Sequence, residues 1–175
     1  MKKLLIIAVS VLCLAFTMNT TARAADEMAV GGGLGLTFPV GSYANDLIDY
    51  TLPIFLNFQY AFDPQITVEA DFYHTLITST PGDFSLTVYQ LGASGRYWLD
   101  NAFNGIYFGG GIASTTTKAG GASSSDLTLV MKGGYTMNFQ QHDDIYLDFG
   151  GRLDLIDFDV DFLVLTGYAM VVKTF

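Results

Sequence analysis

Apolar side chains recur at every second position through most of the chain after Met28, and this period is typical of β-strands, not helices. In the first run, Met28, Val30 and Leu34 share one face while Ala29 and glycines share the other. The sequence contains eight such runs, at 28–38, 51–62, 66–73, 89–97, 106–113, 127–138, 145–155 and 162–175. The last run is apolar on both faces, so the alternation leaves its orientation open.

The glycines indicate which face of these strands points inward. Eight of them lie opposite the large apolar residues, at Gly31, Gly33, Gly35, Gly92, Gly109, Gly111, Gly134 and Gly150. An eight-stranded barrel is only just wide enough inside for side chains, so small residues suit its lumen, while the bulky opposite face must contact lipid. The sequence therefore predicts an all-β fold: an eight-stranded antiparallel transmembrane β-barrel. Gly31, Gly33, Gly35, Gly109 and Gly111 could also leave a slit along one side of the lumen.

Aromatic residues gather at the two ends of the predicted strands, as expected for belts at the two membrane interfaces. One belt is predicted from Tyr60, Phe62, Tyr97, Trp98, Tyr107, Phe108, Phe139, Tyr146 and Phe175, and the other from Phe38, Tyr50, Phe72, Phe84, Tyr89, Phe158 and Phe162.

The first 24 residues have the pattern of a cleaved secretory signal peptide. Lys2 and Lys3 precede an apolar run, and Ala22 and Ala24 occupy the small-residue positions before the cut. The predicted organisation is a signal peptide at 1–24 and a barrel domain at 25–175. Cleavage would remove Cys13, which excludes disulfides, thiolate metal sites and a cysteine nucleophile from the exported chain.

The charge balance excludes other classes of protein. Charged residues make up 14% of the chain, where a soluble domain carries roughly 25%. Without residues 1–24, 5 basic residues remain against 17 acidic ones, a net charge of −12. Binding to nucleic acid is not expected of such a chain.

Connections of two kinds alternate along the chain. Longer ones are expected at 39–50, 78–85, 116–125 and 156–161, and short turns at 63–64, 99–104 and 140–144. In outer-membrane barrels the longer loops face the cell exterior and the short turns face the periplasm.

Three features carry a family resemblance: the glycine-rich first strand leading into Phe38-Pro39-Val40-Gly41, the Gly105–Ala113 strand and the terminal Phe175. With them the chain resembles the small outer-membrane β-barrels of Gram-negative bacteria, that is, the barrel domains similar to outer membrane proteins A, X and W and the porin-like barrel domains. The resemblance implies the outer membrane as location and Phe175 as a signal for the outer-membrane assembly machinery. It also implies outer-membrane lipids and lipopolysaccharide as partners, a monomer, and no cofactor. Lys173 departs from the family pattern, which usually has an aromatic or apolar residue there.

Charged residues are also predicted on the inner face, in mid-strand, at Glu69, Asp71, Arg96, Lys132, Asp148, Arg152 and Asp154. Buried ions need partners, so these residues could form a structural plug of paired charges or a gate on an ion path. Arg152 and Asp71 are expected at similar height on opposite strands, and thus as a pair or water-bridged network.

Other candidate sites are weaker. His74 and His142 are the only imidazole bases, and Ser79 lies near His74 in sequence, but no signature of a lipid-modifying barrel enzyme is recognisable. Asp154, Asp157, Asp159 and Asp161 could bind a divalent cation or form a solvated acidic loop. The sequence thus favours a non-enzymatic barrel with a structural, envelope-integrity or surface-interaction role. The alternatives are a narrow cation-preferring pore and, third, a lipid-modifying enzyme.

Overall fold

The computed structural model describes residues 27–47, 49–79, 86–119, 121–139 and 142–175. The predicted signal peptide at 1–24 lies outside these residues, as does Phe84 of the predicted aromatic belt. The strands are β1 (Glu27–Pro39), β2 (Tyr50–Asp63), β3 (Ile66–Ser79), β4 (Leu86–Trp98), β5 (Gly105–Ala119), β6 (Ala122–Phe139), β7 (His142–Ile156) and β8 (Leu163–Thr174). Two short helices, α2 (Ser42–Leu47) and η1 (Val160–Phe162), lie in connections. No helix in the described part of the chain is long and apolar enough to cross a membrane.

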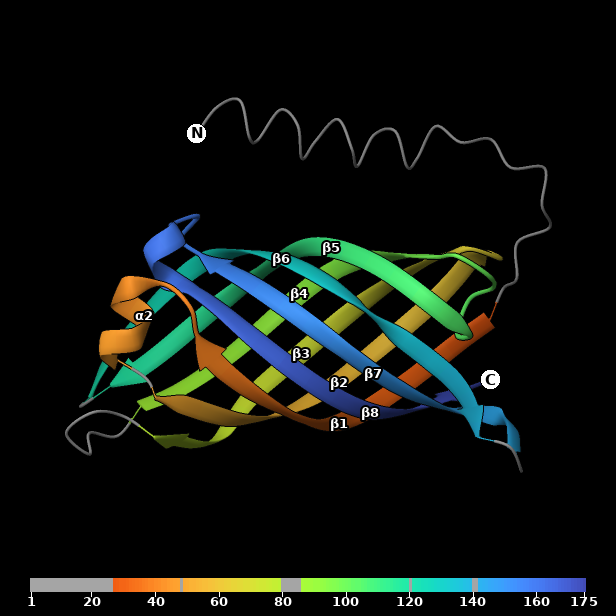
Figure 1. Ribbon diagram of the computed structural model, residues 1–175, viewed down its shortest axis with the longest axis horizontal. Coiled ribbons are helices and arrows are strands. Elements are labelled where there is room, and N and C mark those ends of the chain that lie inside the picture. The colour runs from red at the N-terminus through yellow and green to blue at the C-terminus, as the bar shows by residue number, and fades with distance from the viewer. Residues whose placement is uncertain (1–26, 48, 80–85, 120, 140–141) are drawn as a thin grey trace.

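The predicted eight-stranded antiparallel barrel is confirmed. Each strand pairs with its neighbours in sequence, and β1 pairs with β8 from Ala29↔Thr174 to Pro39↔Val164, which closes the sheet. Closure leaves no free sheet edge among the strands. Figure 1 shows the elongated barrel with α2 at one end and the C-terminus at the other.

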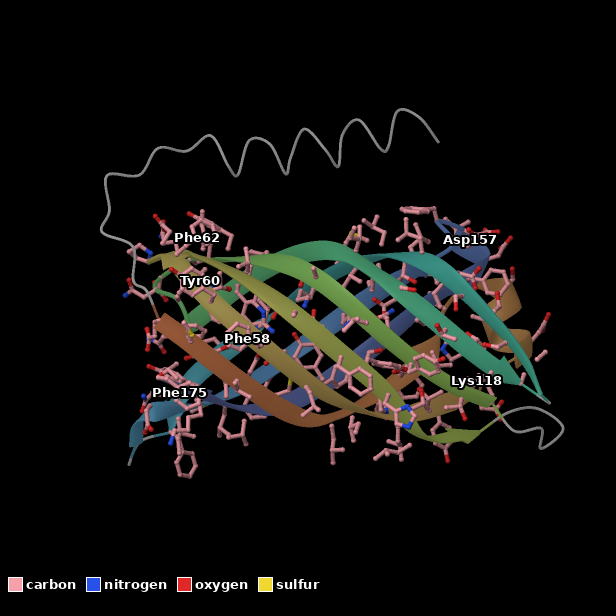
Figure 2. All side chains as sticks on the ribbon, turned by 180° about the vertical axis from the view of Figure 1, so that it is seen from behind. Phe58, Tyr60, Phe62, Lys118, Asp157 and Phe175 are labelled. Atoms are coloured by element: carbon pink, nitrogen blue, oxygen red, sulfur yellow. The ribbon has the colours of Figure 1, made fainter. Side chains whose placement is uncertain are left out.

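The two ends differ in the connections they carry. Lys118 and Asp157 lie at the end that carries α2 and η1, here called the loop end (Figure 2). Phe62 and Phe175 lie at the opposite end, here called the turn end, where β2 connects to β3, β4 to β5 and β6 to β7 (Figure 2).

The side chains divide between the two faces of the sheet as the alternation predicts. Large apolar residues such as Leu56, Leu91 and Phe108 are exposed on the outside, whereas threonines, glutamines and charged residues are buried inside. Strand β8, left open by its sequence, places Val164, Thr166, Tyr168, Met170 and Val172 inward. Lys173, the residue that departs from the family pattern, therefore points outward, and its Nζ lies 3.4 Å from Asp144 Oδ2.

One predicted long loop is wrong. Residues 116–125, expected as a flexible connection, continue β5 and β6 until Ala119 pairs with Ala122. Thr and Ser residues pair across the two strands here, with 2.8 Å between Thr116 Oγ1 and Ser125 Oγ. Such hydroxyl pairs stabilise the pairing of β5 and β6 beyond the part of the strands that has alternating apolar residues. Gly121 has φ +89°, a conformation that glycine adopts without strain, and this allows the chain to reverse tightly.

Candidate functional site

The candidate site is the filled lumen of the barrel. All seven charged residues expected on the inner face are buried there: Glu69, Asp71, Arg96, Lys132, Asp148, Arg152 and Asp154. They come from β3, β4, β6 and β7, and each occupies the inward position of its strand's alternation.

Five of them form what we call the main charge cluster, consisting of Glu69, Asp71, Arg96, Lys132 and Asp148. Arg96 donates from Nε to Glu69 Oε2 at 2.9 Å and from Nη1 to Asp148 Oδ2 at 2.7 Å. Lys132 Nζ donates to Glu69 Oε1 and, at 2.8 Å, to Asp71 Oδ2. Because each cation bridges two carboxylates, the cluster links strands that are not neighbours in the sheet.

A second, smaller group contains Arg152, Asp154 and Gln90. Arg152 Nε donates to Asp154 Oδ1 at 2.8 Å, and its Nη2 donates to Gln90 Oε1. Arg152 and Asp71 do not form the direct pair that was one of the two expectations, since Asp71 contacts Lys132; the water-bridged network stays a prediction. The reason is local: Arg152 and Asp154 lie two residues apart on the same face of β7, within reach of each other without crossing the lumen.

Two tyrosines complete the main charge cluster, a role that the sequence pattern did not predict. Tyr107 donates its hydroxyl proton to Asp148 Oδ1 at 2.8 Å, and its oxygen lies 2.6 Å from that of Tyr168. The guanidinium carbon of Arg96 lies 4.3 Å from the centre of the Tyr107 ring. Tyr107 was expected in an aromatic belt, yet it stands between Ile106 and Phe108, which both face outward. Strict alternation would have placed it inside.

The inward glycines make room for these side chains and leave no slit beside them. A Cβ at Gly109 would lie 3.0 Å from Lys132 Cγ, and one at Gly150 would lie 2.7 Å from the Tyr107 hydroxyl. Similarly, a Cβ at Gly35 would lie 2.6 Å from the Phe55 ring. The expected slit beside Gly31, Gly33, Gly35, Gly109 and Gly111 is therefore wrong, because side chains from neighbouring strands occupy the space the glycines leave.

The electrostatics of the lumen favour occlusion. Three cations face four carboxylates, and every one of these charged side chains has at least one oppositely charged partner. Removing one partner from such a buried set leaves an uncompensated charge, which is far costlier than losing a surface pair. The network can therefore hold strands together and obstruct the lumen with little net charge.

The turn end contains a further group of buried aromatic side chains. Trp98, expected in an aromatic belt, points inward and donates from Nε1 to Thr67 Oγ1 at 3.2 Å. Its ring centre lies 4.8 Å from that of Tyr107 and 6.0 Å from that of Phe103. Phe103, in the β4–β5 turn, is also buried, and the only sequence signal for it is a large aromatic residue within the polar stretch Asp100–Asn104.

The remaining candidate residues do not come together. His74 points outward and stacks on Phe72, with 6.3 Å between ring centres, and the side chains of His142 and Ser79 lie outside the described part of the structure. Asp154 binds Arg152, Asp159 accepts from the backbone N–H of Asp161, and Asp161 accepts from Ser42 Oγ at 2.6 Å. Among the described residues, no three His, Cys, Asp or Glu side chains gather as a metal site.

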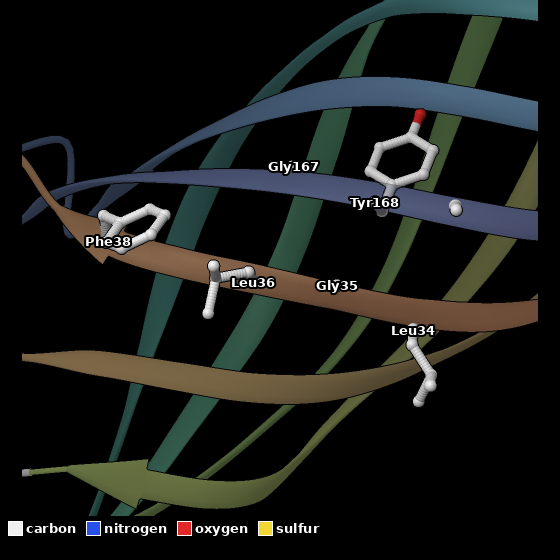
Figure 3. A pocket seen from close by; sticks show the side chains of 7 residues that line it. Leu34, Gly35, Leu36, Phe38, Gly167 and Tyr168 are labelled. Carbon is white, nitrogen blue, oxygen red and sulfur yellow. The ribbon is translucent and has the colours of Figure 1, made fainter.

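The outside of the barrel carries an apolar groove along the seam between β1 and β8. Leu34, Leu36 and Phe38 project from β1 beside Gly167 and Ala169 of β8 (Figure 3). The lining is almost wholly apolar, so the groove is part of the hydrophobic outer surface.

Comparisons with known proteins support the fold. No protein-family model and no curated protein matches the chain. Among solved structures, neisserial surface protein A superposes with a TM-score of 0.62 at 14% identity, over 85% of this chain and 96% of that one. The attachment invasion locus protein Ail of Yersinia pestis, in complex with the heparin analogue sucrose octasulfate, gives 0.62 at 18% identity, over 85% and 98%. The N-terminal β-barrel domain of Pseudomonas aeruginosa OprF gives 0.58 at 7% identity, over 87% and 100%. By its fold, this chain is a small closed eight-stranded antiparallel β-barrel, similar to these solved barrels.

Proposed function

We propose that this chain is a non-enzymatic outer-membrane barrel that supports envelope integrity or surface interaction, with a lumen that is closed in its resting form. The observation that carries the proposal is Glu69, whose two carboxylate oxygens contact Arg96 and Lys132 inside the barrel. This contact ties β3 to β4 and β6 while it fills the lumen. The apolar outer surface, with large exposed side chains around the barrel, suits a lipid environment.

The same proposal includes export and assembly. Residues 1–24 would act as a cleaved signal peptide, leaving the domain at 25–175, and Phe175 would be read by the outer-membrane assembly machinery. Phe175 is 72% exposed, so its ring is available to a partner. We further propose outer-membrane lipids and lipopolysaccharide as the surroundings of a monomer, with no cofactor.

A narrow cation-preferring pore is the second candidate, favoured by one observation. The lumen holds four carboxylates against three cations, and the described outer connections carry exposed Asp46, Asp157 and Asp159. If a small path opened, this excess of negative charge would concentrate cations in it.

Conductance of the purified, refolded chain in a planar bilayer separates the two candidates. The closed barrel predicts no resolvable current, whereas the pore predicts a small, cation-selective one. A gene deletion assayed for detergent sensitivity and outer-membrane leakiness then tests the scaffold role. A large unselective current, or a deletion with an unaltered envelope, contradicts the scaffold proposal.

A further inference from the structure

The β4–β5 turn carries an inward-pointing aromatic side chain at the turn end of the barrel. Phe103 is only 1% exposed, although it lies in a six-residue connection between Trp98 and Gly105. Its ring contacts those of Trp98 and Tyr146, with centres 6.0 and 6.3 Å away. We call Trp98, Phe103 and Tyr146 the aromatic cork.

The backbone of this turn is held in an unusual conformation. Phe103 has φ +63°, in the left-handed region that a bulky non-glycine residue occupies only at a cost. Such strain persists where surrounding contacts over-determine it. Here the contacts are the buried ring itself and the hydrogen bond from Ala102 N–H to Pro64 O at 2.6 Å.

Hydrogen bonds to the neighbouring turn fix the position of the cork. Trp98 N–H donates to Gln65 O at 2.8 Å, and Gln65 Nε2 lies 3.4 Å from Leu99 O. The β4–β5 turn is therefore fastened to the β2–β3 turn at this end of the barrel.

The aromatic cork and the main charge cluster follow each other along the lumen. Arg96, the central cation of the cluster, has its guanidinium carbon 5.9 Å from the Trp98 ring centre. Thr136 is paired with Gly105, at the foot of the turn, and with Asp148, in the cluster. Its Oγ1 is buried and has no hydrogen-bond partner among the described residues. A buried hydroxyl of this kind is an ordinary binding point for water.

We propose that Phe103 sets the permeability of the lumen at the turn end, so that the barrel holds two barriers in series: the main charge cluster and the aromatic cork. The inference rests on the closed barrel of the proposed function and deepens it. Neutralising the cluster cations alone leaves the cork in place, and the lumen stays closed.

Cysteine accessibility tests the cork directly. In a Cys13→Ser background, the substitution Thr136→Cys places a thiol between the two barriers. We expect a positively charged methanethiosulfonate reagent to modify this thiol at least tenfold faster when Phe103→Ala is added, since truncation opens the turn end to water. Phe108→Ala is the matched control, because Phe108 belongs to the same hairpin but faces outward. Phe103→Leu should preserve most of the protection.

Conductance provides the second measurement. Lys132→Gln with Arg96→Gln should stay closed, whereas the same pair with Phe103→Ala should conduct. An unchanged labelling rate in a Phe103→Ala barrel whose far-UV circular dichroism is native overturns the cork. So does a charge-neutralised double variant that conducts as much as the triple variant. Two other results would contradict the proposed function and not the cork. They are a current through the unmodified chain and a deletion strain with an unaltered envelope.

Discussion

The hydroxyl groups of Tyr107 on β5 and Tyr168 on β8 lie 2.6 Å apart inside the barrel, above the backbone of Gly150 on β7. A Cβ at Gly150 would meet both hydroxyls, at 2.7 Å from that of Tyr107 and 2.5 Å from that of Tyr168. The glycine and the tyrosine pair are thus one packing unit, built from three strands.

This packing unit predicts a large effect of an added methyl group at Gly150 and almost none at the adjacent Gly151. Gly150→Ala should lower the free energy of unfolding by about 1–3 kcal/mol, because the added methyl displaces two buried rings. Gly151→Ala should change it by less than about 0.5 kcal/mol, since nothing lies within 4 Å of that Cβ. Urea unfolding in detergent micelles, followed by the fluorescence of the single tryptophan, Trp98, measures both. Equal effects at the two positions would contradict the packing unit.

Lys132→Met should destabilise the barrel by about 3–5 kcal/mol, because Glu69 and Asp71 lose a buried partner. Lys173→Met is the matched control: Lys173 and Asp144 have side chains 54% and 50% exposed, and such a pair contributes at most about 1 kcal/mol. Similar unfolding midpoints for the two variants would show that the lumen cluster does not stabilise the fold.

The two ends of the barrel should be distinguishable in cells. A short epitope inserted after Gly121 should be labelled by antibody on intact cells, because this position lies at the loop end. An epitope inserted at His142 should be labelled only after the outer membrane is permeabilised, since the β6–β7 connection lies at the turn end. Surface labelling at His142 would reverse the proposed orientation.

Phe175→Ala should separate assembly from stability. Phe175 is exposed and its N–H donates to Met28 O at 2.8 Å, a backbone bond that alanine retains. The refolded variant should therefore unfold at the same urea concentration as the unmodified chain. Its amount in the outer-membrane fraction should fall severalfold if Phe175 is the assembly signal. Normal insertion would assign that signal to other residues.

Much of the fold could be predicted from the local pattern of apolar and small residues in the sequence. The alternation that starts at Met28 determined the strands, and the position of Gly31, Gly109 and Gly150 opposite large apolar residues determined which face is the lumen. Both are properties of residues close together in sequence, since strand geometry sends successive side chains to opposite faces. The inward placement of Glu69, Arg96 and Lys132 follows from the same alternation of side chains along the strands.

Only the tertiary structure decided which inward residues meet. Glu69 and Lys132 are 63 residues apart, and their contact depends on strand order, stagger and the width of the closed barrel, none of which alternation encodes. The same geometry brought Gln90 of β4 to Arg152 of β7 and placed side chains from neighbouring strands in the expected slit. The inward position of Phe103 depended on its backbone conformation and on Pro64 and Gln65 of another turn, which the alternation within the strands does not encode. The position of a residue in the alternation determines which face of the sheet its side chain lies on, whereas its contacts across the lumen depend on how the whole sheet closes.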